Sequence, residues 1–153
     1  MNGEILEAIM RYDTKYFGKV EAEEKDLITF DQPMFGFENN TKYLFMMDES
    51  LDGSFIWLQS AEDPDLCFVL ANPCLLGTEY DPKFSENISD IIGRGTYEMW
   101  LVMVISNDFS QSTVNLKSPV IVNLDERRAA QMISEDNFSM KYKLFENIKE
   151  DGK

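Results

Sequence analysis

Residues 112–123 read STVNLKSPVIVN, and this stretch combines the pattern of a buried strand with that of a polar loop. Its apolar residues are Val114, Leu116, Val120, Ile121 and Val122. Pro119 stands among them, and because proline has no backbone N–H to donate, it is confined to the edge of a sheet or to a bulge. We therefore expect a strand with a bulge or an edge at Pro119. Its polar residues could serve an active site, a sheet edge or a docking surface.

Strand-like segments fill much of the remaining chain. They cover residues 14–20, 27–30, 42–47, 54–60, 66–71 and 96–105. The turn-like DESLDG between the third and fourth of these segments predicts a β-hairpin. Many short strands with turns every ~8–12 residues are typical of barrels and sandwiches. The predicted fold is therefore mostly β: a small antiparallel β-barrel-like or sandwich domain with a few short helices.

Helical signals are few and short. Residues 81–92 form one candidate helix. Residues 125–133 form a better one, because Asn123 or Asp125 can cap its start and acidic residues follow early. Residues 1–12 are expected to add one helical turn.

The length of 153 residues corresponds to one domain. We see no repeat, no low-complexity region and no linker in it. We expect an N-terminal extension at residues 1–13, a single domain at residues 14–145 and a frayed tail at residues 146–153.

The net charge is strongly negative, at −14 from 28 acidic and 14 basic residues. Phosphate binding needs Lys and Arg, so direct nucleic-acid binding and attachment to an anionic membrane are disfavoured. A basic protein partner is favoured, because long-range attraction speeds encounter. The simpler interpretation is that the acidity only keeps the protein soluble.

The chain carries no signs of export or of a bound cofactor. It has neither a secretory signal nor the ~20 consecutive apolar residues of a membrane span, so we expect a cytoplasmic protein without a membrane partner. Cys67 and Cys74 are then expected to be reduced, and without histidine they make no plausible zinc site. Asn-x-Ser/Thr sequons begin at Asn39, Asn87 and Asn137, but they matter only in a secreted protein.

Catalytic and metal-binding motifs are weak. No histidine occurs, which removes Ser-His-Asp and Cys-His catalysis. The acidic residues of EDPD (62–65) could supply a carboxylate pair, but Glu62 and Asp63 are adjacent and Pro64 forces a turn, so a polar turn between two strands is the favoured interpretation. Residues 48–54 resemble the start of a calcium loop, yet Gln59 stands where the bidentate glutamate belongs. We therefore expect no catalytic residue, no metal and no cofactor.

Aromatic residues and methionines are abundant, with 11 Phe, 6 Tyr, 2 Trp and 9 Met. Most of them must be core, and Trp57 and Trp100 are expected to be core or half-buried strand residues. Some of the surplus could line an exposed apolar groove that accepts a partner helix, a usual role of Met-rich surfaces.

Four segments follow one another along the chain: TKYFGKVE (14–21), ITFDQPMFGFE (28–38), WLQSAEDPDLCFVLANP (57–73) and STVNLKSPVIVN (112–123). In this order they resemble the FliW family of flagellar assembly factors. The first resembles the family's first strand, the second its I-T-F…P-x-x-G-F-E pattern, the third its L-Q-S…P-x-L-x-F-x-L…P block and the fourth its T-x-N-L-x-[AS]-P block. Ala130 and Gln131 fit the A-x-Q helix that follows. The resemblance spans residues 14–145. It departs from the family at Gln32, where glycine is more common before Pro33.

The resemblance implies a small β-barrel-like protein that is not an enzyme. It implies cytoplasmic binding of flagellin and of the RNA-binding regulator CsrA, whose repression of flagellin translation is relieved when the partners exchange. It is consistent with a monomer when unbound. Exposed positions within the matching segments are the candidate partner contacts: Glu62, Asp63, Asp65, Asn115, Lys117 and Asn123. The alternative is that these side chains only cap turns and sheet edges.

Three other functions stay open at this stage. The first is a barrel that binds an apolar ligand, which requires a deep apolar cavity. The second is a carboxylate-based hydrolase, which requires two facing carboxyl groups, one with a raised pKa. The third is another acidic protein-binding chaperone or regulator.

Overall fold

The computed structural model describes residues 9–145. The expectations for residues 1–8 and for the frayed tail at 146–153 lie outside the described residues.

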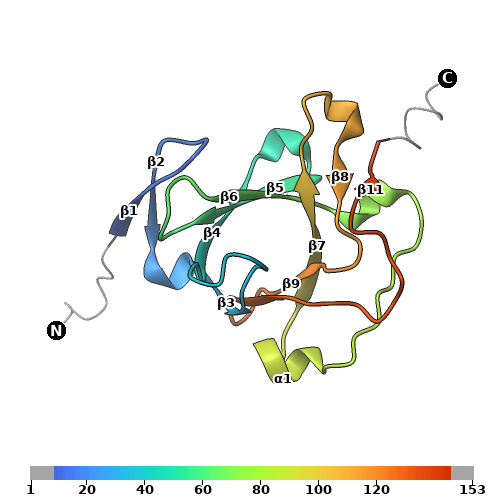
Figure 1. The fold of residues 1–153 in the computed structure, drawn as a ribbon. Coiled ribbons are helices and arrows are strands. Elements are labelled where there is room, and N and C mark those ends of the chain that lie inside the picture. The colour runs from blue at the N-terminus through green and yellow to red at the C-terminus, as the bar shows by residue number, and fades with distance from the viewer. Residues whose placement is uncertain (1–8, 146–153) are drawn as a thin grey trace.

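Seven strands close into a barrel (Figure 1). Around the ring they are β3 (Ile28–Gln32), β4 (Lys42–Met47), β5 (Phe55–Ser60), β6 (Cys67–Ala71), β7 (Tyr97–Val104), β9 (Val120–Asn123) and β10 (Arg128–Gln131). Neighbours in the ring run antiparallel except β3 and β10, which are parallel. The predicted mostly β, barrel-like fold class and the hairpin of β4 and β5 are confirmed.

The eight-residue strand β7 has two partners along one edge. Its first half pairs with β9, and its second half pairs with the short β8 (Thr113–Val114). Met103 faces Val114 and Trp100 faces Val120. The segment that contains β8 and β9 therefore uses twice as many residues as β7 over the same span. Residues 115–119 take up this excess, which confirms the bulge predicted at Pro119.

The N-terminal strand prediction at residues 14–20 is wrong over most of its length. Residues 14–18 form the turn of a hairpin between β1 (Ile9–Asp13) and β2 (Lys19–Glu23). The Thr14 hydroxyl accepts from the Phe17 N–H at 2.8 Å and donates to the Gly18 carbonyl at 2.7 Å, while Gly18 takes φ +67°. The helical turn expected in the first dozen residues is also wrong where it is described, because β1 occupies that part.

The helix predicted at residues 125–133 is replaced by a turn and the strand β10. The Asn123 carboxamide oxygen caps the N–H groups of Asp125 and Glu126, as the sequence suggested. Arg127 then takes φ 55°, which reverses the chain, and Ala129 is buried completely beside β3. Tertiary burial of small residues against β3 outweighs their helix propensity.

The helix predicted at residues 81–92 is reduced to α1 (Ile88–Ile92). Ahead of α1, the chain is tied to a distant segment. The Lys83 N–H donates to Asp136 Oδ2 at 2.8 Å, and the Lys83 carbonyl accepts from the Glu135 N–H at 2.7 Å. These backbone groups are therefore not available to a helix.

The remaining elements are short. They are the 3₁₀ turns η2 (Glu24–Asp26), η3 (Glu49–Leu51), η4 (Pro73–Leu76) and η5 (Phe109–Gln111), and the strand β11 (Tyr142–Lys143). Strand β11 pairs with β8 and extends the sheet beyond β7.

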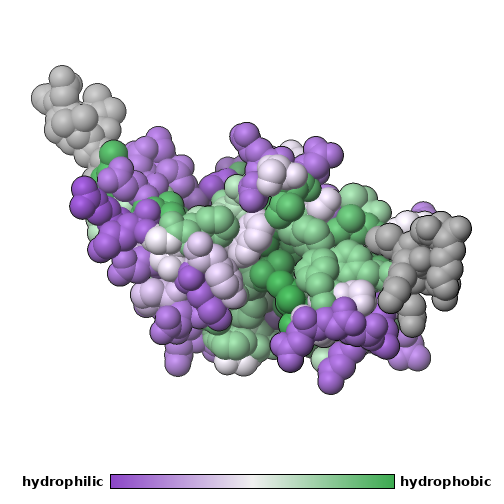
Figure 2. Space-filling view, turned by 90° about the horizontal axis from the view of Figure 1, so that it is seen from above, coloured by the Kyte–Doolittle hydropathy of each residue, from purple (hydrophilic) through white to green (hydrophobic). Residues whose placement is uncertain are grey.

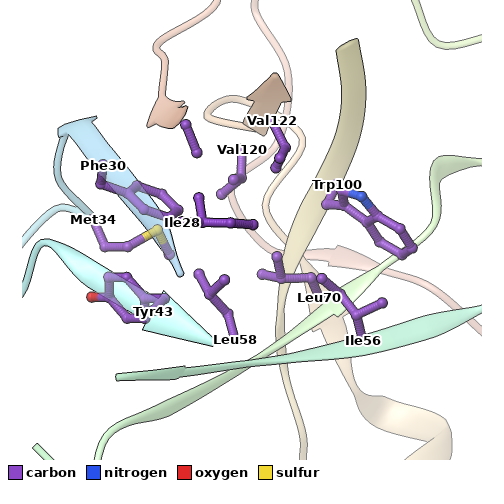
Figure 3. Close-up of a cluster of buried hydrophobic side chains, with 11 residues drawn as sticks. Ile28, Phe30, Met34, Tyr43, Ile56, Leu58, Leu70, Trp100, Val120 and Val122 are labelled. Atoms are coloured by element: carbon purple, nitrogen blue, oxygen red, sulfur yellow. The ribbon is translucent and has the colours of Figure 1, made fainter. Parts of the chain in front are cut away.

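Side chains fill the interior of the barrel (Figure 3). Phe30, Tyr43, Leu58 and Leu70 meet there, and Trp100 closes one side. A second cluster, which includes Leu101 and Val114, and a third beneath α1, which includes Ile92, lie outside this interior. A filled interior opposes the interpretation of the protein as a barrel for an apolar ligand.

Tyr43 is the one buried side chain of the described residues 9–145 whose polar atom has no hydrogen-bond partner. Burial, and then the nearby Glu62 carboxylate, raises the pKa of its phenol. An unsatisfied buried hydroxyl costs ~1–3 kcal/mol. We expect Tyr43→Phe to raise the free energy of unfolding at pH 7 by about 1 kcal/mol in urea titrations.

The same substitution should flatten the alkaline pH dependence. The pKa of Tyr43 is higher in the folded protein than in the unfolded protein, where it is ~10. The stabilisation that this difference gives is complete below pH ~10 and is lost as the pH rises and the unfolded phenol ionises. The exposed Tyr16→Phe is the control and should change neither quantity. A Tyr43→Phe protein that is less stable than the parent at pH 7 would contradict this account.

Candidate functional site

One row of apolar side chains crosses the outer wall of the barrel. Trp57, Val69, Met103 and Val114 lie directly opposite one another on β5, β6, β7 and β8. Side chains alternate along a strand, and the neighbours Ile56, Leu58 and Leu70 point inward (Figure 3). The row therefore faces away from the barrel interior.

The middle of this row forms the floor of an apolar groove of about 220 Å³. Leu51 of η3 and Phe55 of β5 line the groove, and so do Ile105 and Phe109 beyond β7. Both Ile105 and Phe109 are 51% exposed. Figure 2 shows this side of the molecule, with apolar surface in the middle and hydrophilic residues around it. The sequence-based expectation that surplus apolar residues line an exposed groove is confirmed.

Aromatic contacts continue the groove at both ends. The ring of Phe17, in the turn of the β1–β2 hairpin, forms a T-shaped pair with Trp57, with centroids 5.3 Å apart. The rings of Phe109 and Phe145 lie 4.8 Å apart. Such pairs add about 0.5–1.5 kcal/mol beyond burial, so both ends of the groove are held in place.

The charged residues of the chain segments that line the groove are acidic only, and Lys15 lies in the hairpin turn at the end where Phe17 meets Trp57. Residues 43–82 and 95–116 contain every residue that lines it, and neither range contains a lysine or an arginine. The 3₁₀ turn η3 carries Asp48, Glu49 and Asp52 in and beside it, and Asp108 precedes η5. Hydrogen bonds from Ser50, first from its side chain and then from its N–H, lower the pKa of Asp48. Its carboxylate is thus kept ionised to lower pH.

The acidic turn between β5 and β6 holds three of the sequence-predicted contact residues together. Glu62, Asp63 and Asp65 are all exposed. Glu62 Oε1 accepts from the N–H groups of Thr41 and Lys42 at 2.8 and 3.3 Å, and Asp63 Oδ1 accepts from the Asp65 N–H at 3.0 Å. Glu62 and Asp63 therefore shape the turn, and Asp65 stays the most available to a partner.

The buried Gln59 beneath this turn is a residue that sequence analysis missed. Its Nε2 lies 3.1–3.3 Å from the carbonyl oxygens of Ser60, Asp63, Pro64 and Leu66. Its Oε1 accepts from the Lys15 N–H at 2.9 Å, which ties the hairpin turn to the barrel. The signal was present, because a glutamine among apolar residues of a strand needs partners for both ends of its amide.

The late-strand candidates serve the fold in this structure. Asn115 Oδ1 accepts from the N–H groups of Lys117 and Ser118, and Lys117 Nζ donates to the Asp136 carbonyl at 2.5 Å. Asn123 is completely buried and also donates to the carbonyls of Ile92 and Arg94. These three residues belong to the bulge and the β9–β10 turn, separate from the acidic turn between β5 and β6.

Metal and nucleophile chemistry find little support in residues 9–145. No group of three or more Cys, Asp or Glu side chains in that range could hold a metal ion. Cys67 and Cys74 are free thiols, and burial raises the pKa of Cys67 to about 11 although Lys15 opposes the shift. Hydrogen bonds from the Gly36 and Lys83 N–H groups lower the pKa values of Glu38 and Asp136, the opposite of what a general acid needs.

In the described part of the chain, none of the helices has the length and apolar character that crossing a bilayer requires.

The fold and the site define a class: a closed seven-stranded β-barrel with an apolar, acid-rimmed groove on its outer wall. The model of one protein family, described as "FliW protein", matches residues 11–144. The chain belongs to this FliW family.

Relatives are similar over nearly the whole chain. The flagellar assembly factor FliW of Caldicellulosiruptor saccharolyticus is 32% identical, with 88% of this chain and 90% of the relative covered. That of a Geobacillus species is 30% identical, with 89% and 96% covered. A crystal structure of the flagellar assembly factor FliW superposes with a TM-score of 0.80 at 28% identity, covering 89% of this chain and 97% of that one.

Gln59→Leu tests the role of the buried amide. The substitution keeps the bulk but leaves buried backbone groups unsatisfied, so we expect the free energy of unfolding to fall by about 1–3 kcal/mol. Amide exchange should speed up at Lys15 and across residues 60–66. The exposed Gln111→Leu is the matched control and should stay within about 0.5 kcal/mol of the parent. Equal stability of both variants would show that Gln59 is not needed for these loops.

Proposed function

We propose that this protein is a non-catalytic flagellar assembly factor of the cytoplasm that binds flagellin and the translational regulator CsrA in exchange. Binding of CsrA would relieve its repression of flagellin translation. The observation that carries the proposal is the family match over residues 11–144, together with relatives named as flagellar assembly factors. A monomer is the expected unbound form.

The charge of the molecule supports a basic protein partner. A regulator that holds RNA must be basic at its RNA site, and a protein of net charge −14 attracts such a surface while it repels RNA phosphates. The exposed carboxylates of the acidic turn and of the groove rim are the groups that would carry this attraction. The groove offers the apolar area that affinity requires.

The proposal predicts a steep dependence of CsrA association on salt. Screening shortens the range of these charges from ~30 Å at 0.01 M to ~8 Å at 0.15 M ionic strength. We expect the association rate constant to fall by roughly tenfold or more over this range in stopped-flow measurements. A rate constant that stays flat would refute electrostatic steering.

Charge reversal in the acidic turn tests its contribution to partner binding. In Asp63→Asn/Asp65→Lys, asparagine keeps the acceptor for the Asp65 N–H while the charge changes. We expect slower association with CsrA and an unchanged melting temperature. The control Glu86→Lys/Glu135→Gln makes the same change in net charge at other exposed positions. If both variants slow association equally, overall charge and not the acidic turn is responsible.

A pull-down from a flagellated bacterium, with this protein as bait, tests the proposal as a whole. Recovery of flagellin together with a small basic RNA-binding protein would support it. Recovery of neither, from cells that produce both, would overturn it.

A further inference from the structure

The floor of the apolar groove offers no free backbone edge. Strand β5 is paired with β4 and β6, β6 with β5 and β7, and β7 with β6 on one side and β8 and β9 on the other. A peptide strand therefore cannot extend the sheet at this place. An occupant must use side chains alone and must satisfy its own backbone hydrogen bonds, which a helix does.

We propose that the groove seats the apolar face of an amphipathic helix of a protein partner, with Lys or Arg residues on both sides of that face. This inference rests on the proposed function, because it states which kind of segment a partner presents to this protein. Two or three large apolar side chains at helical spacing would enter between η3 and η5 and contact Trp57, Val69 and Met103.

The size of the groove favours side-chain anchors over a separate small molecule. Pockets for small ligands usually measure ~300–1,000 Å³, whereas this groove holds about 220 Å³. Its seven lining residues are aliphatic, aromatic or Met, and the Trp57 indole N–H is their one polar side-chain group, so the groove offers few groups to orient a small ligand. Apolar anchors in an aromatic-lined pocket are the usual centre of a protein–protein contact.

The acidic residues around the groove favour a helix with basic residues on both sides of its apolar face. The chain segments that line the groove contain no basic residue, and η3 and η5 bring carboxylates to its two sides. Lys15 lies in the hairpin turn, at the end where Phe17 meets Trp57. Lysines and arginines beside the apolar face of a helix would meet these carboxylates. A second copy of this chain is disfavoured, because two such acidic rims would face each other.

A synthetic helix provides a direct test. The probe is an 18-residue labelled peptide with Leu at positions i, i+3 and i+7 and Lys on both flanks, and binding is followed by fluorescence anisotropy. We expect Ile105→Glu to weaken binding by roughly tenfold or more, since it puts a charge into the apolar wall. Ile133→Glu, at another exposed isoleucine outside the groove, should leave binding unchanged.

A second peptide tests the charge requirement. It has Glu in place of each flanking Lys, and we expect it to bind at least roughly tenfold more weakly than the Lys peptide. Glu49→Lys should reduce the difference in affinity between the Lys peptide and the Glu peptide, whereas Glu86→Lys should not. Equal binding of both peptides, or equal loss with Ile105→Glu and Ile133→Glu, would overturn the inference.

Two further measurements separate this inference from the proposed function. Sedimentation of the parent protein and of Ile105→Glu should show the same mass, and a dimer that Ile105→Glu dissociates would mean that a second copy occupies the groove. A protein that binds the Lys peptide but neither flagellin nor CsrA would refute the proposed function alone. If Ile105→Glu binds the Lys peptide, flagellin and CsrA as the parent does, the groove is not the helix-binding site, and the proposed function is unaffected.

Discussion

Double use of one edge of β7 is the constraint on which this structure depends. Pairing with β9 closes the ring, while pairing with β8 extends the sheet past it. Both pairings lie along the same strand because residues 115–119 bulge out between them. Within the bulge, Asn115 Oδ1 accepts hydrogen bonds from the N–H groups of Lys117 and Ser118. The extension toward β8 supplies the outer apolar layer, so the filled interior and the groove outside it follow from one arrangement of strands.

Buried side-chain amides hold several loops of the barrel in place through hydrogen bonds to the backbone. Gln59 holds the acidic turn, Asn123 holds the β9–β10 turn, and Gln131 accepts from the Phe35 N–H and donates to the Ser118 carbonyl. Gly95 lies so close to Asn123 that a Cβ there would come within 2.4 Å of Oδ1. Neutral amides therefore position these loops from the inside, while carboxylates such as Glu62 and Asp136 cap backbone N–H groups at the surface.

The sequence predicted the strands far better than the rest. Alternating and apolar runs such as 42–47 and 96–105 report burial directly, and these strands lie where expected. Helix signals at 125–133 failed because contact with β3 decides the conformation of Ala129, and local sequence does not contain that contact. The groove was foreseen only as a surplus of apolar residues, since its floor joins β5, β6 and β7, and their register is a property of the folded sheet.

The parallel pairing of β3 with β10 has a consequence for how the protein is made. Thr29 lies opposite Arg128, which is 99 positions further along the chain. Such distant contacts form late and slow folding. On the ribosome, the earlier strands emerge first, and their sheet stays open until β9 and β10 pair with it. The ring closes only after residue 131 has left the exit tunnel. Until then the nascent chain exposes strand edges that are paired in the finished protein, and unpaired edges of this kind promote aggregation.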